Sequence, residues 1–241
     1  MDFDAHLFWE ALSSGTYAKG ALLALGLTVS SLGAAIVLGF LLAIGRASRF
    51  RVLRWAVWVY VWFFRATPTL LQLLFVWYAL PQLIPSLNAT WFTPFIAAFV
   101  ALSLNEAAYM AEIVRGGLLA VDPGQRLAAR ALGMTPPRIL RKVVIPQAVR
   151  IIIPPTGNEF ITLLKLTSLA SVISLRELLT VAQQDTAVQF RFAEFYGAAL
   201  VYYLVMVSAM MALQWELERH FTWSSARRRF RAATPLVPAE H

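Results

Sequence analysis

The side chains most able to do chemistry in this chain are a few polar or charged residues inside long apolar stretches. Glu159, Thr162 and Leu166 recur at helical spacing and share a face. Asn105 and Glu106 form a similar but weaker case. Because an unpaired charge in lipid is costly, such residues must face the interior of a helix bundle or a wet cavity. A carboxylate such as Glu159 suits an ammonium group; the alternative is a buried ion pair or hydrogen bond to a neighbouring helix.

Two proline-containing segments accompany these residues. Pro68 follows Arg65 and lacks an amide proton, so a broken helix is expected there, and such backbone survives in a membrane only beside protein or a water cavity. Arg65 then either meets a ligand, or snorkels to an interface or pairs with an acid. The segment PPTG, 154–157, predicts a second break before Glu159. A helix that begins there would point its amide protons toward the cavity and suit a carboxylate.

Catalytic and metal chemistry find little support in the sequence. The chain has no cysteine, and its three histidines, His6, His220 and His241, lie near the termini or the ends of apolar stretches. We therefore predict no catalytic residue and no metal site. No Gly-x-x-x-x-Gly-Lys-Ser/Thr run is present, so the chain is not expected to hold ATP in the usual phosphate cradle.

The composition predicts an all-α integral membrane protein with about five transmembrane helices. Hydrophobic residues make up 59% of the chain and charged residues 14%, which does not fit a soluble domain with one ordinary core. A span needs about 20 apolar residues, so 241 residues fit one bundle. The predicted segments are an interfacial N-terminus at 1–19, a transmembrane domain at 20–219 with spans at 20–45, 52–80, 91–119, 151–175 and 195–217, a polar loop at 122–150, and a basic tail at 220–241.

The loop DPGQRLAARALGMTPPRILRKVVIPQAVR, from Asp122 to Arg150, is too polar to cross a bilayer and is well punctuated. Asp122-Pro123 reads as an N-cap and first helical residue, and Gly133 as a left-handed stop. Thr135-Pro136 reads as a second cap and start. The loop is therefore predicted to form two short helices held at an angle. The alternative is a surface amphipathic hairpin that only joins two spans.

Several motifs resemble the permeases of ABC importers. Ala128-Ala129, then Gly133, then Val143-x-Ile145-Pro146 match the EAA loop of that family in order and spacing. The segments at 63–81, 107–125 and 154–173 resemble the polar amino acid permeases, so matches extend over most of 20–219.

The resemblance implies the type I ABC importer permease fold and a loop that couples to an ATPase. The coupling residues it implies are Gly124, Leu127, Ala128, Ala129, Gly133 and Pro146. The implied partners are two ATPase subunits that bind ATP and Mg²⁺, a second permease subunit that is identical or a paralogue, a periplasmic substrate-binding protein, and membrane lipid. The implied substrate is a polar amino acid, with an amino-acid-derived solute such as an opine, cystine or an ectoine-like compound as the alternative.

The sequence departs from the family at two positions. Leu127 stands where the family usually has Glu, so docking at that point is expected to be apolar and weakly dependent on salt. Leu166 stands where relatives often carry an acid. The substrate preference is therefore expected to lean toward neutral polar or acidic amino acids.

The basic residues predict the orientation. Sixteen of the twenty-one lysines and arginines fall in three clusters, at 46–54, 115–150 and 219–231, which share one side if there are five spans. The positive-inside rule then places the N-terminus outside and the loop and tail in the cytoplasm. The resemblance implies a bacterial inner membrane, with the N-terminus in the periplasm. Nucleic-acid binding is not expected. A membrane-embedded enzyme or assembly factor, and an ion-coupled carrier, remain as alternatives, although carriers are usually built from paired repeats.

Overall fold

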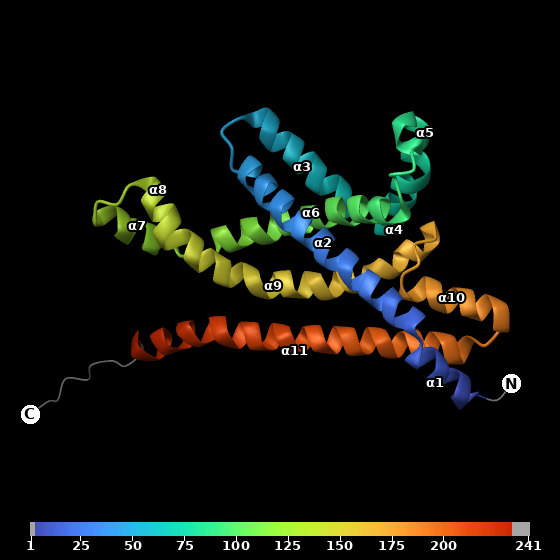
Figure 1. The fold of residues 1–241 in the computed structure, drawn as a ribbon. Helices are drawn as coiled ribbons and strands as arrows, with labels where there is room; N and C mark the ends of the chain where they lie inside the picture. Colours follow the sequence, from blue (N-terminus) through green and yellow to red (C-terminus); the bar gives the residue numbers. More distant parts are fainter. Residues whose placement is uncertain (1–2, 233–241) are drawn as a thin grey trace, which may run out of the picture.

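The computed structural model describes residues 3–232, with side chains as far as residue 219. This part of the chain is helical and contains no strand, so the predicted all-α class is confirmed (Figure 1). The predicted basic tail at 220–241 lies outside the residues whose side chains are described. The α-helices are α1 (Ala5–Ser13), α2 (Gly15–Arg46), α3 (Arg51–Ala66), α4 (Thr69–Leu74), α5 (Leu80–Leu83), α6 (Pro94–Leu119), α7 (Pro123–Ala131), α8 (Pro136–Ile139), α9 (Ile145–Leu166), α10 (Leu178–Gln189) and α11 (Phe192–Ala232).

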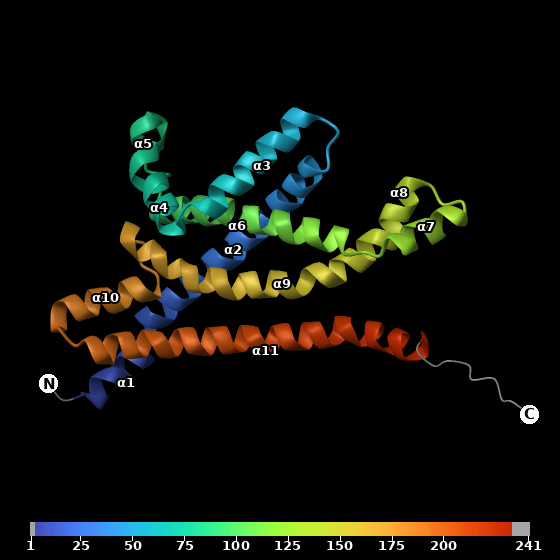
Figure 2. The ribbon, with the colours of Figure 1, turned by 180° about the vertical axis from the view of Figure 1, so that it is seen from behind.

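The main core lies where α2 crosses α6, and the two helices approach each other very closely there. A Cβ atom on Gly39 would stand 2.5 Å from the Cβ of Met110, so this crossing requires a residue without a side chain. Helix α9 also packs on α6, and α11 runs beside α9 and α10 (Figures 1 and 2). A smaller core joins α1, α2, α10 and α11.

Among the described residues, three helices are long and apolar enough to cross a membrane by themselves: α2, α6 and the part of α11 at Phe192–Arg219. Two bent pairs bring the number to five if each pair is one span. Arg51–Ala66 and Thr69–Leu83 meet at 105°, and Pro136–Ile173 and Leu178–Gln189 meet at 46°. The helices do not coincide with the predicted spans: α6 begins at Pro94 and not at 91, and the helix of the fourth span begins at Pro136 and not at 151. The exact membrane boundaries stay a prediction.

The two proline segments behave differently. Helix α3 ends at Ala66, Thr67 is extended, and α4 begins after Pro68, as expected for a residue without an amide proton. The predicted break at 154–157 is wrong, because α9 runs through both prolines without interruption. Side chains support this stretch: the Thr156 hydroxyl donates to the Ile152 carbonyl at 2.8 Å, and Gln214 Nε2 of α11 donates to the Pro154 carbonyl at 3.3 Å. No helix therefore begins just before Glu159.

The second helix of the loop begins at Pro136 as predicted, but it does not end within the loop. Helix α7 stands alone, but the helix that begins at Pro136 continues through a π-helical turn, Leu140–Val144, directly into α9. A wider turn is favourable before Pro146, whose missing amide cannot close the usual α-helical hydrogen bond. Thr135 occupies the N-cap position but makes no side-chain capping bond. The loop thus holds the short helix α7 and a second helix that is continuous with the fourth span.

Candidate functional site

Two acidic residues from different helices lie near each other inside the membrane-spanning part of the bundle. Glu106 on α6 is 1% exposed, and its Oε1 is buried without a hydrogen-bond partner among the described residues. Glu159 on α9 is half-buried. The two carboxylates lie within electrostatic reach of each other, and Arg65 at the end of α3 lies within reach of Glu159. We call Glu106 and Glu159 the carboxylate pair.

Arg65 also has a structural contact. Its guanidinium lies 5.4 Å from the ring centre of Tyr109, in cation–π geometry. It lines a hollow of about 360 Å³ together with Glu112. Glu112 itself pairs with Arg115, three residues further along α6: its Oε2 accepts from Nε at 2.9 Å and from Nη2 at 2.6 Å. The contacts of Arg65 therefore suit the packing interpretation, and direct ligand contact stays a prediction.

Asn105 points to a different neighbour. It is 3% exposed, and its Nδ2 donates to the Phe64 carbonyl at 3.1 Å and to Gln72 Oε1 at 3.0 Å. Gln72 in turn donates to the Phe64 carbonyl at 3.0 Å and to Thr67 Oγ1 at 2.7 Å. These bonds satisfy backbone groups that the break at Pro68 leaves open. Asn105 thus holds the broken helix together, and the structure does not join it to the carboxylate pair.

The two remaining predicted residues of α9 make their contacts with groups other than the carboxylate pair. Thr162 is exposed, and its hydroxyl donates to the Asn158 carbonyl at 3.0 Å. Leu166 packs partly buried against the main hydrophobic core. Of the predicted substrate residues, only Glu159 stands in the cluster. The sequence analysis treated Glu106 as a weaker candidate, although it is a carboxylate inside an apolar helix. It did not identify Gln72, a lone amide in the run TLLQLLF.

Helix α7 has the local geometry that its sequence indicates. Asp122 Oδ1 accepts a hydrogen bond from the Gly124 amide at 2.7 Å, and Pro123 is the first helical residue. Gly133 has φ of +73°, in the region that favours glycine, and it ends the helix. The predicted cap, start and stop of this helix are confirmed.

Helix α7 is anchored on one side and open on the other. Ala129 is 5% exposed and packs with Val121, Ile139 and Val144 in a small separate core. On the outer side, Leu127 is 62% exposed. The remaining predicted coupling residues Gly124, Ala128, Gly133 and Pro146 are exposed as well. The outer side of α7 is therefore a surface of small residues and one leucine that faces away from the bundle.

The arrangement suits binding and docking. Within the described part of the chain, no group of three His, Cys, Asp or Glu residues is placed to hold a metal ion. The carboxylate pair can receive a cation, and the outer side of α7 can fit an apolar groove.

Comparison with known proteins places the chain in a family. Residues 35–220 match the family model described as "Binding-protein-dependent transport system inner membrane component". The arginine transport system permease protein ArgU of Corynebacterium glutamicum is 42% identical, over 87% of this chain and 69% of that protein. The octopine transport system permease protein OccM of Rhizobium radiobacter is 39% identical, over 86% and 85%. The glutamine transport system permease protein GlnP of Escherichia coli K12 is 34% identical, over 91% and 98%.

Solved structures show the same fold. A crystal structure of an amino acid ABC transporter with histidines superposes with a TM-score of 0.82 and 34% identity, over 91% of this chain and 99% of that one. The methionine ABC transporter MetNI, at 22% identity and a TM-score of 0.68, shares the fold. The chain therefore belongs to the family of binding-protein-dependent transport system inner membrane components, as a multi-pass permease subunit of the amino acid ABC transporter type, which hydrolyses no ATP itself and works with a partner ATPase.

Proposed function

We propose that this permease subunit imports polar amino acids by alternating access and that the carboxylate pair binds the positive group of the substrate. Glu106 carries the proposal: its carboxylate is buried within electrostatic reach of Glu159, and one of its oxygens has no hydrogen-bond partner among the described residues. Two carboxylates in a poorly solvated site repel each other. An arriving ammonium or guanidinium group would relieve that repulsion and satisfy the open oxygen.

The carboxylate pair supports a broader substrate class than the sequence indicates. Leu166 indicated a weakly acidic site, but the second carboxylate comes from Glu106 on another helix. We therefore propose that amino acids with a cationic side chain are accepted as well as neutral polar ones. Relatives named for arginine and glutamine transport support this range. An amino-acid-derived solute stays the alternative, since two relatives are named for octopine and cystine transport.

Coupling to ATP hydrolysis is assigned to α7. Its inner side is fixed by Ala129 and by Arg126, whose Nη2 donates to the Leu118 carbonyl at 2.8 Å. Its outer side offers Leu127 to a groove on the ATPase. In this proposal two ATPase subunits hold ATP and Mg²⁺, and two permease subunits, identical or paralogous, form the pathway. A periplasmic binding protein delivers the substrate, and closure of the ATPases rocks the spans between two states.

The orientation belongs to the same proposal: N-terminus in the periplasm, α7 and the C-terminus in the cytoplasm. The chain lacks cysteine, so a single cysteine at the exposed position Asn88 reports the side of the membrane. It should react with an impermeant thiol reagent added from outside, and a reporter fused after Arg231 should behave as cytoplasmic. The reverse labelling would refute the orientation.

The decisive test of the substrate role uses the reconstituted assembly and the binding protein loaded with each of a panel of amino acids. Some of them should stimulate ATP hydrolysis, and Glu106→Gln should reduce the response to cationic amino acids more than to neutral ones. The matched control is Glu216→Gln, the same change at an exposed carboxylate of α11. An equal loss for all amino acids would show that Glu106 acts on the fold and does not select the substrate.

A further inference from the structure

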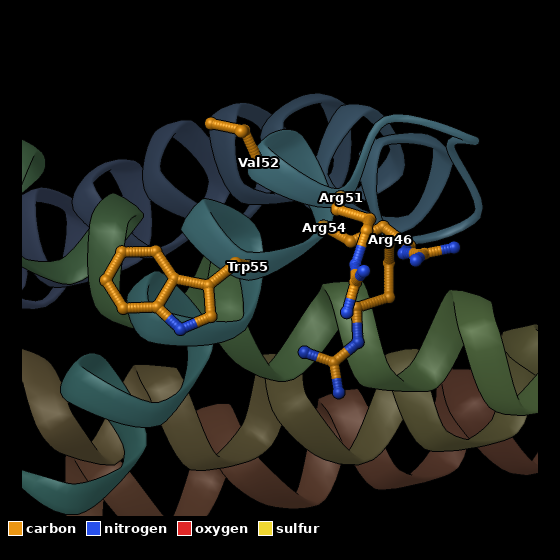
Figure 3. Close-up of a pocket in the computed structure, with 5 residues that line it drawn as sticks. All are labelled: Arg46, Arg51, Val52, Arg54 and Trp55. Atoms are coloured by element: carbon orange, nitrogen blue, oxygen red, sulfur yellow. The ribbon is translucent and has the colours of Figure 1, made fainter.

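A second charged feature lies outside the carboxylate pair, at the turn between α2 and α3. A hollow of about 560 Å³ is lined by five residues, of which three are arginines (Figure 3). Arg46 is the last residue of α2, and Arg51 and Arg54 lie in the first turn of α3; Val52 and Trp55 complete the lining. We call this feature the arginine hollow.

The positive charge of the hollow is poorly compensated. Nη1 of Arg46 is buried and has no hydrogen-bond partner among the described residues. The acid within electrostatic reach of Arg46 is Glu112, whose Oε2 is already bound to Arg115. In the described part of the chain, Arg51 and Arg54 take part in no ion pair. A buried guanidinium nitrogen without an acceptor is costly, so an added anion would be stabilising here.

The start of α3 increases this demand for an anion. The first turn of a helix favours acidic residues, because its free amides give it a positive partial charge. Helix α3 has no acidic residue there and instead places Arg51 and Arg54 beside those amides. Its N-cap residue, Phe50, supplies no side-chain hydrogen bond. The local charge at the bottom of the hollow is therefore positive from both side chains and backbone.

The surroundings of the hollow are apolar and lie at the end of a span. Val52 is 81% exposed and Trp55 66% exposed. One and two turns further along α3, the exposed rings of Trp58 and Trp62 stack with their centres 6.2 Å apart. A ligand that fits both parts has an anionic head for the arginines and hydrocarbon tails for this tryptophan ridge.

We propose that the arginine hollow binds the phosphate headgroup of an anionic phospholipid, with the acyl chains along Trp55, Trp58 and Trp62. Bidentate guanidinium–phosphate bonds suit the three arginines, and basic pockets between spans are known to hold lipid headgroups. Arg46 also lines a neighbouring hollow of about 550 Å³ that reaches Arg126 and Arg130. The arginine hollow therefore adjoins a second hollow that reaches α7. This binding does not depend on the role of the carboxylate pair.

Native mass spectrometry of the purified assembly tests the proposal. The assembly is titrated with phosphatidylglycerol or with phosphatidylcholine of the same acyl chains. The triple variant Arg46→Gln, Arg51→Gln and Arg54→Gln should retain one fewer phosphatidylglycerol per permease chain than the wild type. The matched control removes three exposed charges outside the hollow, by Arg49→Gln, Arg138→Gln and Arg141→Gln, and should retain as many as the wild type.

Three results would overturn the proposal. Equal retention by the two triple variants would mean that the arginines are ordinary solvated charges. Equal retention of phosphatidylcholine in the hollow would show that the headgroup charge is irrelevant. Displacement of the lipid by excess inorganic phosphate alone would identify a site for free phosphate. If the triple variant does not assemble, the exposed pair Arg51→Gln and Arg54→Gln gives the same test, with retention at least several-fold weaker than in the wild type.

Discussion

The carboxylate pair and α7 are two polar regions of an apolar chain, and they are built in opposite ways. Helix α7 is shaped by neighbours in the sequence, with Asp122 at its start and Gly133 at its end, and it presents most of its surface outside the bundle. Glu106 and Glu159 come from separate helices and lie within electrostatic reach of each other only because α6 packs on α9. Helix α7 is therefore an exposed region set by local sequence, and the carboxylate pair is a more buried region set by tertiary packing.

This difference separates the effects that substitutions should have. A change in the carboxylate pair should alter how substrate is bound and leave the docking of the ATPase intact. A change in α7 should leave substrate recognition intact and disturb the transmission of force. Variants that mix these two effects would show that the two regions are not functionally distinct.

The largest effect is expected for Glu159→Gln, which preserves size and removes the charge. Loss of a charge-assisted hydrogen bond of about 1.5–3 kcal/mol should weaken uptake by about 10- to 150-fold. Uptake and substrate-dependent ATP hydrolysis are measured on reconstituted assemblies. The control is Lys165→Gln, an exposed charge on the same helix. Unchanged uptake, or failure to bind the ATPase, would mean that Glu159 is structural.

Gly133→Val should have the next largest effect. A β-branched residue at φ of +73° adds about 1–3 kcal/mol of local strain, which should displace α7. Transport and ATPase stimulation should fall by about 5- to 150-fold while the chain still inserts and the binding protein still docks. The control is Gly116→Val on α6, where an added Cβ meets no atom within 4 Å. Normal transport by Gly133→Val would refute the coupling role of α7.

These two regions also show what the sequence can predict. Caps and stops act within a few residues, so Asp122, Pro123 and Gly133 were enough to predict α7. Pro68 likewise predicted the break in the second span. The proline pair at 154–155 led to the wrong prediction of a helix break, because the hydrogen bond from Gln214 on α11 that supports this stretch is a tertiary contact. The neighbours of Glu106 and Asn105 depend on how α3, α6 and α9 pack, which the pattern of one chain does not contain.

A smaller effect, on stability, is expected for Asn105→Ala. Its removal leaves Gln72 Oε1 without the bond from Nδ2 and leaves a buried polar group unsatisfied, at about 1–3 kcal/mol. The midpoint of thermal unfolding should fall, while the KM for uptake should change little. Ser103→Ala is the control, since its buried hydroxyl has no partner among the described residues and should lose nothing. A raised KM with unchanged stability would instead place Asn105 in the substrate site.

The smallest effect is expected at Leu127, on the outer side of α7. An apolar contact to the ATPase should be nearly independent of salt, because screening acts on charges alone. Leu127→Glu places a carboxylate at a position that is 62% exposed and should make docking depend on salt, by about 0–1 kcal/mol between low and high ionic strength. Affinity for the ATPase is measured across a salt series, with Leu127→Gln as the uncharged control. If the wild-type affinity already falls steeply with salt, arginines near α7 dominate the contact and Leu127 does not. In that case α7 would act through charge, as the carboxylate pair does.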